Sequence, residues 1–287
     1  MKQGLAIVLL FVSAMTGHAM DVAFRYLEQG RNLAESGGMD SLQLQRMESM
    51  YQWEKLSQLD EEASDSELSP ERIRQWEQTR RCFFNVYKLT ESYYRQGKAT
   101  ARQAYEAAQN LYWIEMCVDM LNPHEVGAEK RAQQRILKAA RKYVQRLQRG
   151  SADSGEKHRL AMLHAERCLN ELLLSVGDES LTVQELALVD SIRRNFVDSL
   201  ALANRLHKSG LMHLRTIAEI ELERLRFELY ILVRCGDTRA ARRSAKHLAK
   251  ESASYYHLLK QSGASAEALL TARLRKLAAE RTARQLE

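Results

Sequence analysis

The sequence predicts an all-α protein of long amphipathic helices, which run antiparallel in coiled-coil-like hairpins. Three observations lead to this prediction. Prolines occur only at Pro70 and Pro123, and Ala, Leu, Glu, Arg and Gln, which favour helices, dominate the chain. Extended period-two alternation of β-branched residues, the pattern of strands, is not found. The loops between the helical stretches are short, and short loops place consecutive helices antiparallel.

The N-terminus has the pattern of a secretory signal peptide over residues 1–19. Lys2 precedes an apolar run from Leu5 to about Met15, and small residues at Gly17 and Ala19 suit a signal peptidase. The run is shorter than the ~20 residues of a membrane-spanning helix. We therefore expect cleavage near Ala19 and a periplasmic or outer-membrane-associated protein, with one elongated helical domain over residues 20–287. An N-terminal membrane anchor is the alternative.

Glycines and capping residues predict where each helix ends and the next begins. Ser, Thr, Asp and Asn accept amide hydrogen bonds at a helix start, Pro fits the first turn, and Gly ends helices. In chain order, the breaks fall at Ser36-Gly37-Gly38 before an Asp40/Gln43 capping box, the acidic loop before Ser69 and Pro70, Gly97 before a Thr100/Gln103 box, Asn122-Pro123-His124-Glu125, Gly150 to Gly155, Val176-Gly177-Asp178 before a Thr182/Glu185 box, Ser209-Gly210, Cys235-Gly236-Asp237 and Ser262-Gly263. These breaks predict roughly ten helices.

The breaks recur at similar intervals along the chain. Gly38, Gly97, Gly155, Gly210 and Gly263 are separated by 59, 58, 55 and 53 residues. A second break near the middle of each interval predicts a degenerate two-helix repeat of about 55 residues. Chance similarity among Ala- and Leu-rich helices is the alternative.

Apolar residues form narrow seams along two of the predicted helices. Their spacing of three and four residues favours coiled-coil-style pairing, either within the chain or by self-association. The seams consist of Leu211, Leu214, Ala218, Leu222, Leu225, Leu229 and Leu232, and of Val189, Ile192, Phe196, Leu200, Ala203 and Leu206.

Two of the glycine breaks resemble a motif of the TolC-like outer-membrane efflux proteins. The first is Tyr94-Arg95-Gln96-Gly97 followed by Ala107, Gln109 and Leu111, and the second is Leu206 to Gly210 followed by Ile217, Glu219 and Leu222. The resemblance implies hairpin turns at Gly97 and Gly210, a trimeric periplasmic helical assembly and transport without catalysis. It is partial, because the chain lacks the family's alternating strand segments.

Patterns typical of enzymes are not found in the sequence. His124-Glu125 is not followed by the second histidine of an HExxH zinc motif, and no GxSxG, phosphate-binding loop or dinucleotide fingerprint occurs. His158 and His164 are six residues apart, which places them on different helix faces. We therefore expect a non-enzymatic protein with no catalytic residue, metal site or cofactor.

A run of cations predicts a basic interaction face on one helix. It comprises Lys130, Arg131, Arg135, Lys138, Arg141, Lys142, Arg146 and Arg149. Such a face can contact anionic lipid headgroups or an acidic partner protein. The alternative is a solvated face that pairs with the acidic Glu61 to Glu67 loop. The net charge of +6 is compatible with nucleic acid, but secretion argues against that partner.

The four cysteines allow one predicted disulfide. Cys82 and Cys117 are nearly equidistant from Gly97, so a chain reversal there brings them level and predicts a Cys82–Cys117 bond. Cys168 and Cys235 are less well matched to Gly210, and we expect them to be buried thiols.

Two functions follow from these patterns. The first is a TolC-like component of envelope efflux or secretion. The alternative is a helical repeat scaffold or adaptor that binds other envelope proteins.

Overall fold

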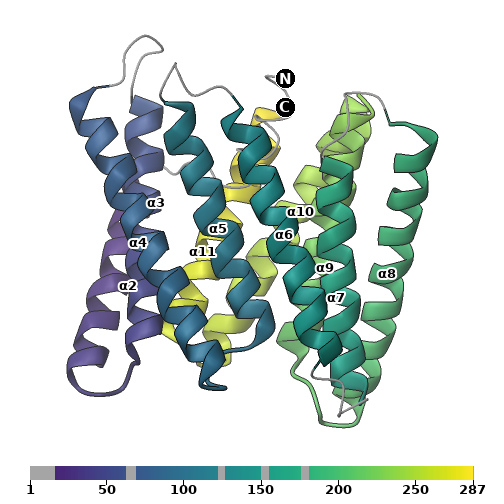
Figure 1. Ribbon diagram of the computed structural model, residues 1–287, viewed down its shortest axis with the longest axis horizontal. Helices are drawn as coiled ribbons and strands as arrows, with labels where there is room; N and C mark the ends of the chain where they lie inside the picture. The colour runs from purple at the N-terminus through teal and green to yellow at the C-terminus, as the bar shows by residue number, and fades with distance from the viewer. Residues whose placement is uncertain (1–16, 63–68, 122–126, 150–154, 176–180, 287) are drawn as a thin grey trace. The chain divides into compact units, whose positions relative to one another are not determined.

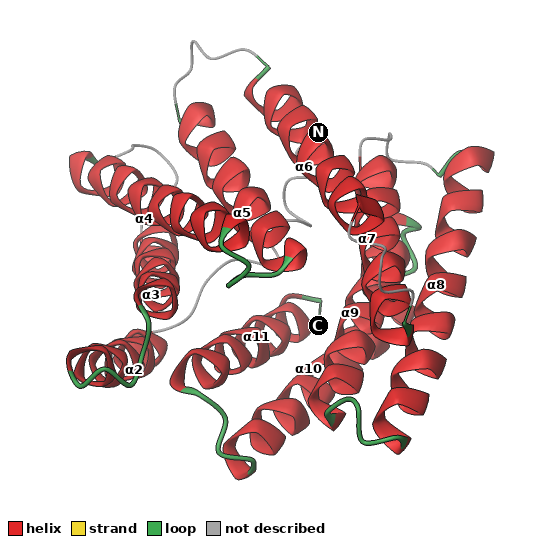
Figure 2. Cartoon of the chain, turned by 60° about the horizontal axis from the view of Figure 1, so that its bottom comes forward, coloured by secondary structure: helices red, strands yellow, loops and turns green. Residues whose placement is uncertain are grey.

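A computed structural model confirms the all-α fold (Figures 1 and 2). It describes residues 17–62, 69–121, 127–149, 155–175 and 181–286, and these ranges contain helices but no strand. The helices are α2 (Gly17–Glu35), α3 (Ser41–Glu62), α4 (Pro70–Arg95), α5 (Ala101–Met120), α6 (Ala128–Arg149), α7 (Glu156–Ser175), α8 (Val183–Lys208), α9 (Leu214–Arg234), α10 (Thr238–Gln261) and α11 (Ala266–Gln285). The coiled-coil-like packing and the 55-residue repeat stay predictions.

Several predicted features fall at least partly on residues outside these ranges. They include most of the signal peptide, the break at residues 122–125 and nearly all of that at 150–155. Helix α2 begins at Gly17 and runs through the predicted cleavage site at Ala19. Among the described helices, none is long and apolar enough to span a membrane.

The predicted capping residues start the helices where the sequence places them. The Ser69 hydroxyl accepts from the Arg72 amide, with Pro70 as the first residue of α4. Reciprocal capping boxes form between Thr100 and Gln103 on α5 and between Thr182 and Glu185 on α8. The Gln43 amide likewise donates to Asp40 Oδ1 over 2.9 Å. These bonds satisfy amides that have no partner within the helix.

The predicted turn at Gly97 joins α4 to α5 by a tight reversal. Gly97 has φ 71°, a left-handed conformation that disfavours other residues. The Lys98 amide donates to the Tyr93 carbonyl over 2.8 Å, and the Gly97 amide to that of Tyr94 over 3.0 Å. These two backbone hydrogen bonds together form a Schellman motif. Gly210, with φ 72°, ends α8 in the same way.

Two other glycines differ from the expected break positions. At the end of α2, Gly37 rather than Gly38 takes the left-handed conformation, with φ 75°. Gly155 precedes α7, and its carbonyl accepts the Arg159 amide, so it starts a helix instead of ending one. The evenly spaced glycines therefore do not share one backbone role: some end a helix, and Gly155 precedes one.

The described chain divides into two compact units. The N-terminal unit comprises Val12–Ala139 and Ala264–Leu274. Within it α2 packs on α3, α3 on α4 and α4 on α5. One of its apolar clusters joins Leu27 and Met47 to Leu270 of α11, and another joins Leu56, Trp76 and Ile114.

The C-terminal unit comprises Ala140–Gly263 and Arg275–Glu287. Here α7 packs on α8, α8 on α9 and α9 on α10. Its core includes Leu174, Ile192, Phe196, Phe227 and Ile231. The prediction of a single domain over residues 20–287 stays a prediction.

The predicted apolar seam on α8 is buried at both ends, and that on α9 is buried in its middle part. Val189, Ile192 and Phe196 on α8 are at most 1% exposed. On α9, Leu222, Leu225 and Leu229 are also buried, whereas Leu211 and Leu214 are 55% and 49% exposed. The beginning of this seam was placed wrongly, because the helix starts only at Leu214.

None of the four cysteines forms a disulfide in the structure, so the Cys82–Cys117 bond is not formed there. Cys117 packs against the cluster of Leu56, Trp76 and Ile114. Burial, followed by the negative charge of Glu48 on α3, raises the pKa of the Cys82 thiol. The pairing stays a prediction for the oxidised protein. Cys235 is exposed, contrary to the expected buried thiol.

Candidate functional site

The eight predicted cations form one face of α6. At 100° per residue they fall within an arc of about 160°, and all are exposed except Arg146, which is half-buried. The opposite side carries the buried Ala132, Ile136, Ala140 and Tyr143. Because this apolar side is buried, the charged side of α6 faces solvent.

Two of these cations are held by acids on the preceding helix, α5. Arg135 Nη1 donates to Glu115 Oε2 over 2.8 Å, and Arg131 Nη2 lies 3.8 Å from Asp119 Oδ2. The Arg135 guanidinium also lies 5.9 Å from the centre of the Tyr112 ring. These contacts restrict the rotamers of both arginines, so that the N-terminal part of α6 and the end of α5 present a defined set of groups.

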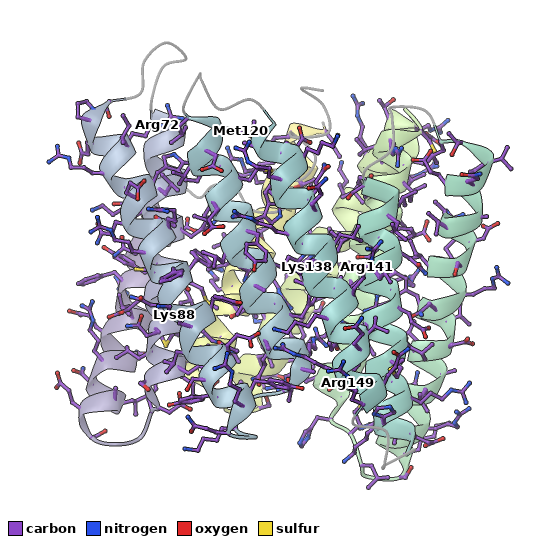
Figure 3. The ribbon with its side chains drawn as sticks, in the orientation of Figure 1. Arg72, Lys88, Met120, Lys138, Arg141 and Arg149 are labelled. Carbon is purple, nitrogen blue, oxygen red and sulfur yellow. The ribbon has the colours of Figure 1, made fainter. Side chains whose placement is uncertain are left out.

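The predicted pairing with the acidic Glu61 to Glu67 loop falls on residues whose side chains lie outside the described ones. Four of the remaining cations, Lys130, Lys138, Arg141 and Arg149, are exposed and make no ion pair within the described part of the chain. Figure 3 labels Lys138, Arg141 and Arg149, with Arg149 farthest along α6. Part of the basic face thus keeps its charge available.

An aromatic and an apolar side chain on α5 border the basic residues. Tyr112 is half-buried, and burial followed by the neighbouring Tyr87 raises the pKa of its phenol to about 12, so the group stays neutral. Met120, at the end of α5, is 42% exposed (Figure 3). We name the patch of Tyr112, Glu115, Asp119, Met120, Arg131, Arg135 and Lys138 the α5–α6 surface. It lies wholly within the N-terminal unit.

No metal site emerges from the described residues. No group of three His, Cys, Asp or Glu residues within these ranges has the arrangement of metal ligands. An open depression on α3 and α4 is lined by Gln45, Asn85, Lys88, Leu89 and Ser92. The depression is open and therefore does not exclude water.

The C-terminal unit contains two interhelical polar contacts that the sequence patterns did not predict. Arg167 of α7 is 2% exposed, is paired with Glu223 of α9, and lies 4.3 Å from the centre of the Phe196 ring. Tyr255 of α10 donates to Glu219 Oε1 over 2.6 Å. These contacts join α7 to α8 and α9, and α9 to α10.

A second basic helix, α10, was not predicted from the sequence. Helix α10 carries Arg239, Arg242, Arg243, Lys246, Lys250 and Lys260, all exposed. The spacing rule that singled out α6 applies here too, so this face was detectable from the sequence.

Comparison with known proteins supplies no family: no protein-family model matches the sequence, and no curated protein matches it.

Proposed function

We propose that the protein is a non-enzymatic helical scaffold that binds an acidic partner protein through the α5–α6 surface. The observation that carries this proposal is the fixed arrangement of Arg131 and Arg135 against carboxylates of α5, beside the exposed Lys138 and Met120. The expected residence in the cell envelope remains part of the proposal.

The composition of the α5–α6 surface favours a protein as its partner. Protein interfaces are enriched in Tyr, Met and Arg, which combine large contact areas with polar groups. Tyr112 and Met120 offer such contact area, while Lys138 offers an unpaired charge. Arg135 loses less side-chain entropy on binding, because Glu115 already positions it.

A photo-crosslinking amino acid placed at position 120 or 138 tests the proposal in cells that express the full chain. We expect one discrete adduct from both positions, and mass spectrometry should identify an acidic protein in it. Position 197 is the matched control, because Val197 is 64% exposed and lies on α8 in the other unit. Reversal of charge by Lys138→Glu should abolish the adduct at position 120. Equal adducts at all three positions, or none at 120 and 138, would contradict the proposal.

A second candidate function, a component of TolC-like envelope efflux or secretion, rests on the turn at Gly97. The Tyr94 carbonyl and the Gly97 amide form the hydrogen bond that closes this turn, at the residues that carry the resemblance. Cell fractionation followed by gel filtration of the extracted protein tests this candidate. A trimer in the outer-membrane fraction would support it, and a monomer in the soluble fraction would exclude it while leaving the scaffold proposal intact.

A further inference from the structure

The solvent-facing side of α10 carries a row of positive charge, with five cations between Arg239 and Lys250 and a sixth at Lys260. The six cations Arg239, Arg242, Arg243, Lys246, Lys250 and Lys260 fall within an arc of about 100° along a straight stretch of roughly 30 Å, at 1.5 Å per residue. We name this set the α10 stripe. It lies entirely on one helix of the C-terminal unit.

The opposite side of α10 anchors the helix in its unit. Ala241, Ala245, Leu248, Tyr255 and Leu259 are each at most 5% exposed. Because this apolar side is already covered, α10 cannot insert it into a bilayer as a free amphipathic helix would. The stripe can therefore act only through its charges and their aliphatic stems.

The exposed residues of α10 have an unusually uniform chemistry. Besides the stripe, they are Thr238, His247, Ser254, His257 and Gln261. None is acidic and none is a large apolar residue. Arg239, Arg242, Arg243 and Lys250 make no ion pair within the described part of the chain. The acid closest in sequence, Glu251, is half-buried and lies 3.6 Å from His247 at the side of the stripe.

From this arrangement we infer that the α10 stripe is a contact surface for a membrane that contains anionic lipid. A flat headgroup layer meets all six cations of a straight helix at once, whatever their spacing. Each Lys or Arg close to such a surface strengthens binding by roughly fivefold. The inference does not depend on the proposed scaffold function, which concerns α5, α6 and the other unit.

Two other polyanions fit the stripe less well. An acidic protein partner would be expected to engage apolar or aromatic anchors, which the exposed side of α10 lacks. A single-stranded nucleic acid would be expected to stack its bases on Phe, Tyr or Trp side chains, and none of these is exposed on α10. Both remain as outcomes of the test below.

Sedimentation with phosphatidylcholine vesicles, prepared with and without phosphatidylserine, tests the inference on the full-length protein. We expect binding only to the phosphatidylserine vesicles, and weaker binding as salt screens the charges. The variant Arg239→Gln/Arg242→Gln/Arg243→Gln/Lys250→Gln should bind at least about 100-fold more weakly. Circular dichroism should show an unchanged helix content, because all four positions are exposed.

The matched control neutralises four exposed cations of α6: Lys130→Gln/Lys138→Gln/Arg141→Gln/Arg149→Gln. Both variants lower the net charge from +6 to +2, so only the location of the charge differs. The control should retain vesicle binding within about threefold. Equal loss in both variants, retention in the α10 variant, or absence of binding by the unaltered protein would overturn the inference. Tighter binding of polyglutamate or a single-stranded oligonucleotide than of vesicles, lost in the α10 variant, would also overturn it.

Discussion

Arg234 Nη2 donates to Glu185 Oε1 over 2.7 Å, and the two side chains are only 7% and 10% exposed. Arg234 Nη1 also donates to the Leu174 carbonyl over 2.8 Å. The pair therefore connects the end of α9 to the start of α8 and the last turn of α7. A buried charge of this kind depends on its partner, because removal of one member leaves the other desolvated and unpaired.

Glu185→Gln should lower the free energy of unfolding by about 2 to 3 kcal/mol, because Arg234 keeps its burial and loses its counter-charge. Urea denaturation followed by circular dichroism measures the change. Glu228→Gln is the control, since its partner Arg193 forms a two-bond pair but is 45% exposed. Removal of that pair should cost less than about 1 kcal/mol. Equal costs at both positions would contradict the special role of Glu185.

The same carboxylate should make stability depend on pH in the acid range. The Thr182 amide, followed by the Arg234 hydrogen bond, lowers the pKa of Glu185 from 4.5 to about 2. A lowered folded-state pKa stabilises the protein above pH 4.5, and this contribution disappears as the pH falls to about 2. The stability difference between the unaltered protein and Glu185→Gln should therefore be constant above pH 4.5 and shrink below it. A difference that grows on acidification would refute this assignment.

Gly97→Ala should destabilise the protein by about 1 kcal/mol through its backbone alone. An added Cβ meets no atom within 4 Å, and φ is +71°. Gly38→Ala is the comparison, because Gly38 is not in the left-handed region, although its Cβ would come 3.4 Å from the Leu33 carbonyl oxygen. Thermal denaturation of both variants measures the effect. A larger loss for Gly38→Ala would mean that crowding, and not backbone conformation, limits these turns.

Phe196→Ala should cost about 3 to 5 kcal/mol, the usual range for a buried aromatic residue. The ring is 0% exposed, lies 5.9 Å from that of Phe227 between centroids, and supports the Arg167 guanidinium. Phe84→Ala removes a side chain that is 41% exposed and should cost much less. Chemical denaturation distinguishes the two, and similar losses would argue against the packing of this core.

Cysteine alkylation should proceed in a defined order in the reduced protein. Cys235 is exposed and should react first. Burial and the nearby Glu48 raise the pKa of Cys82, so less of it is the reactive thiolate near pH 8. Timed maleimide labelling with peptide mapping measures both rates, and Glu48→Gln should accelerate Cys82 alone. Faster labelling of Cys82 than of Cys235 would contradict the structure.

Local features of the fold could be predicted because neighbouring residues determine them. Thr100 and Gln103, three positions apart, form the predicted capping box without help from the rest of the chain. Gly97 likewise ends α4 because only glycine adopts its backbone conformation easily. The helical spacing of the α6 cations likewise predicts that they share one face of the helix.

The pairs that join distant helices could not be predicted. Arg167 and Glu223 lie 56 residues apart, and nothing near either residue indicates the other. Predicting them requires knowledge of which helices pack together. Similarly, Asp119 and Glu115 were not predicted as partners of the α6 arginines. The sequence does not indicate which residues of α5 and α6 lie side by side.

The packing order has a consequence for synthesis on the ribosome. The most extensive helix contacts in the described chain join sequence neighbours within α2–α5 and within α7–α10, so most helices can find a partner soon after they emerge. Helix α11 differs, because its Leu270 packs against Leu27 and Met47, which are synthesised much earlier. The unit that is begun first is therefore completed only when the last part of the chain has been translated.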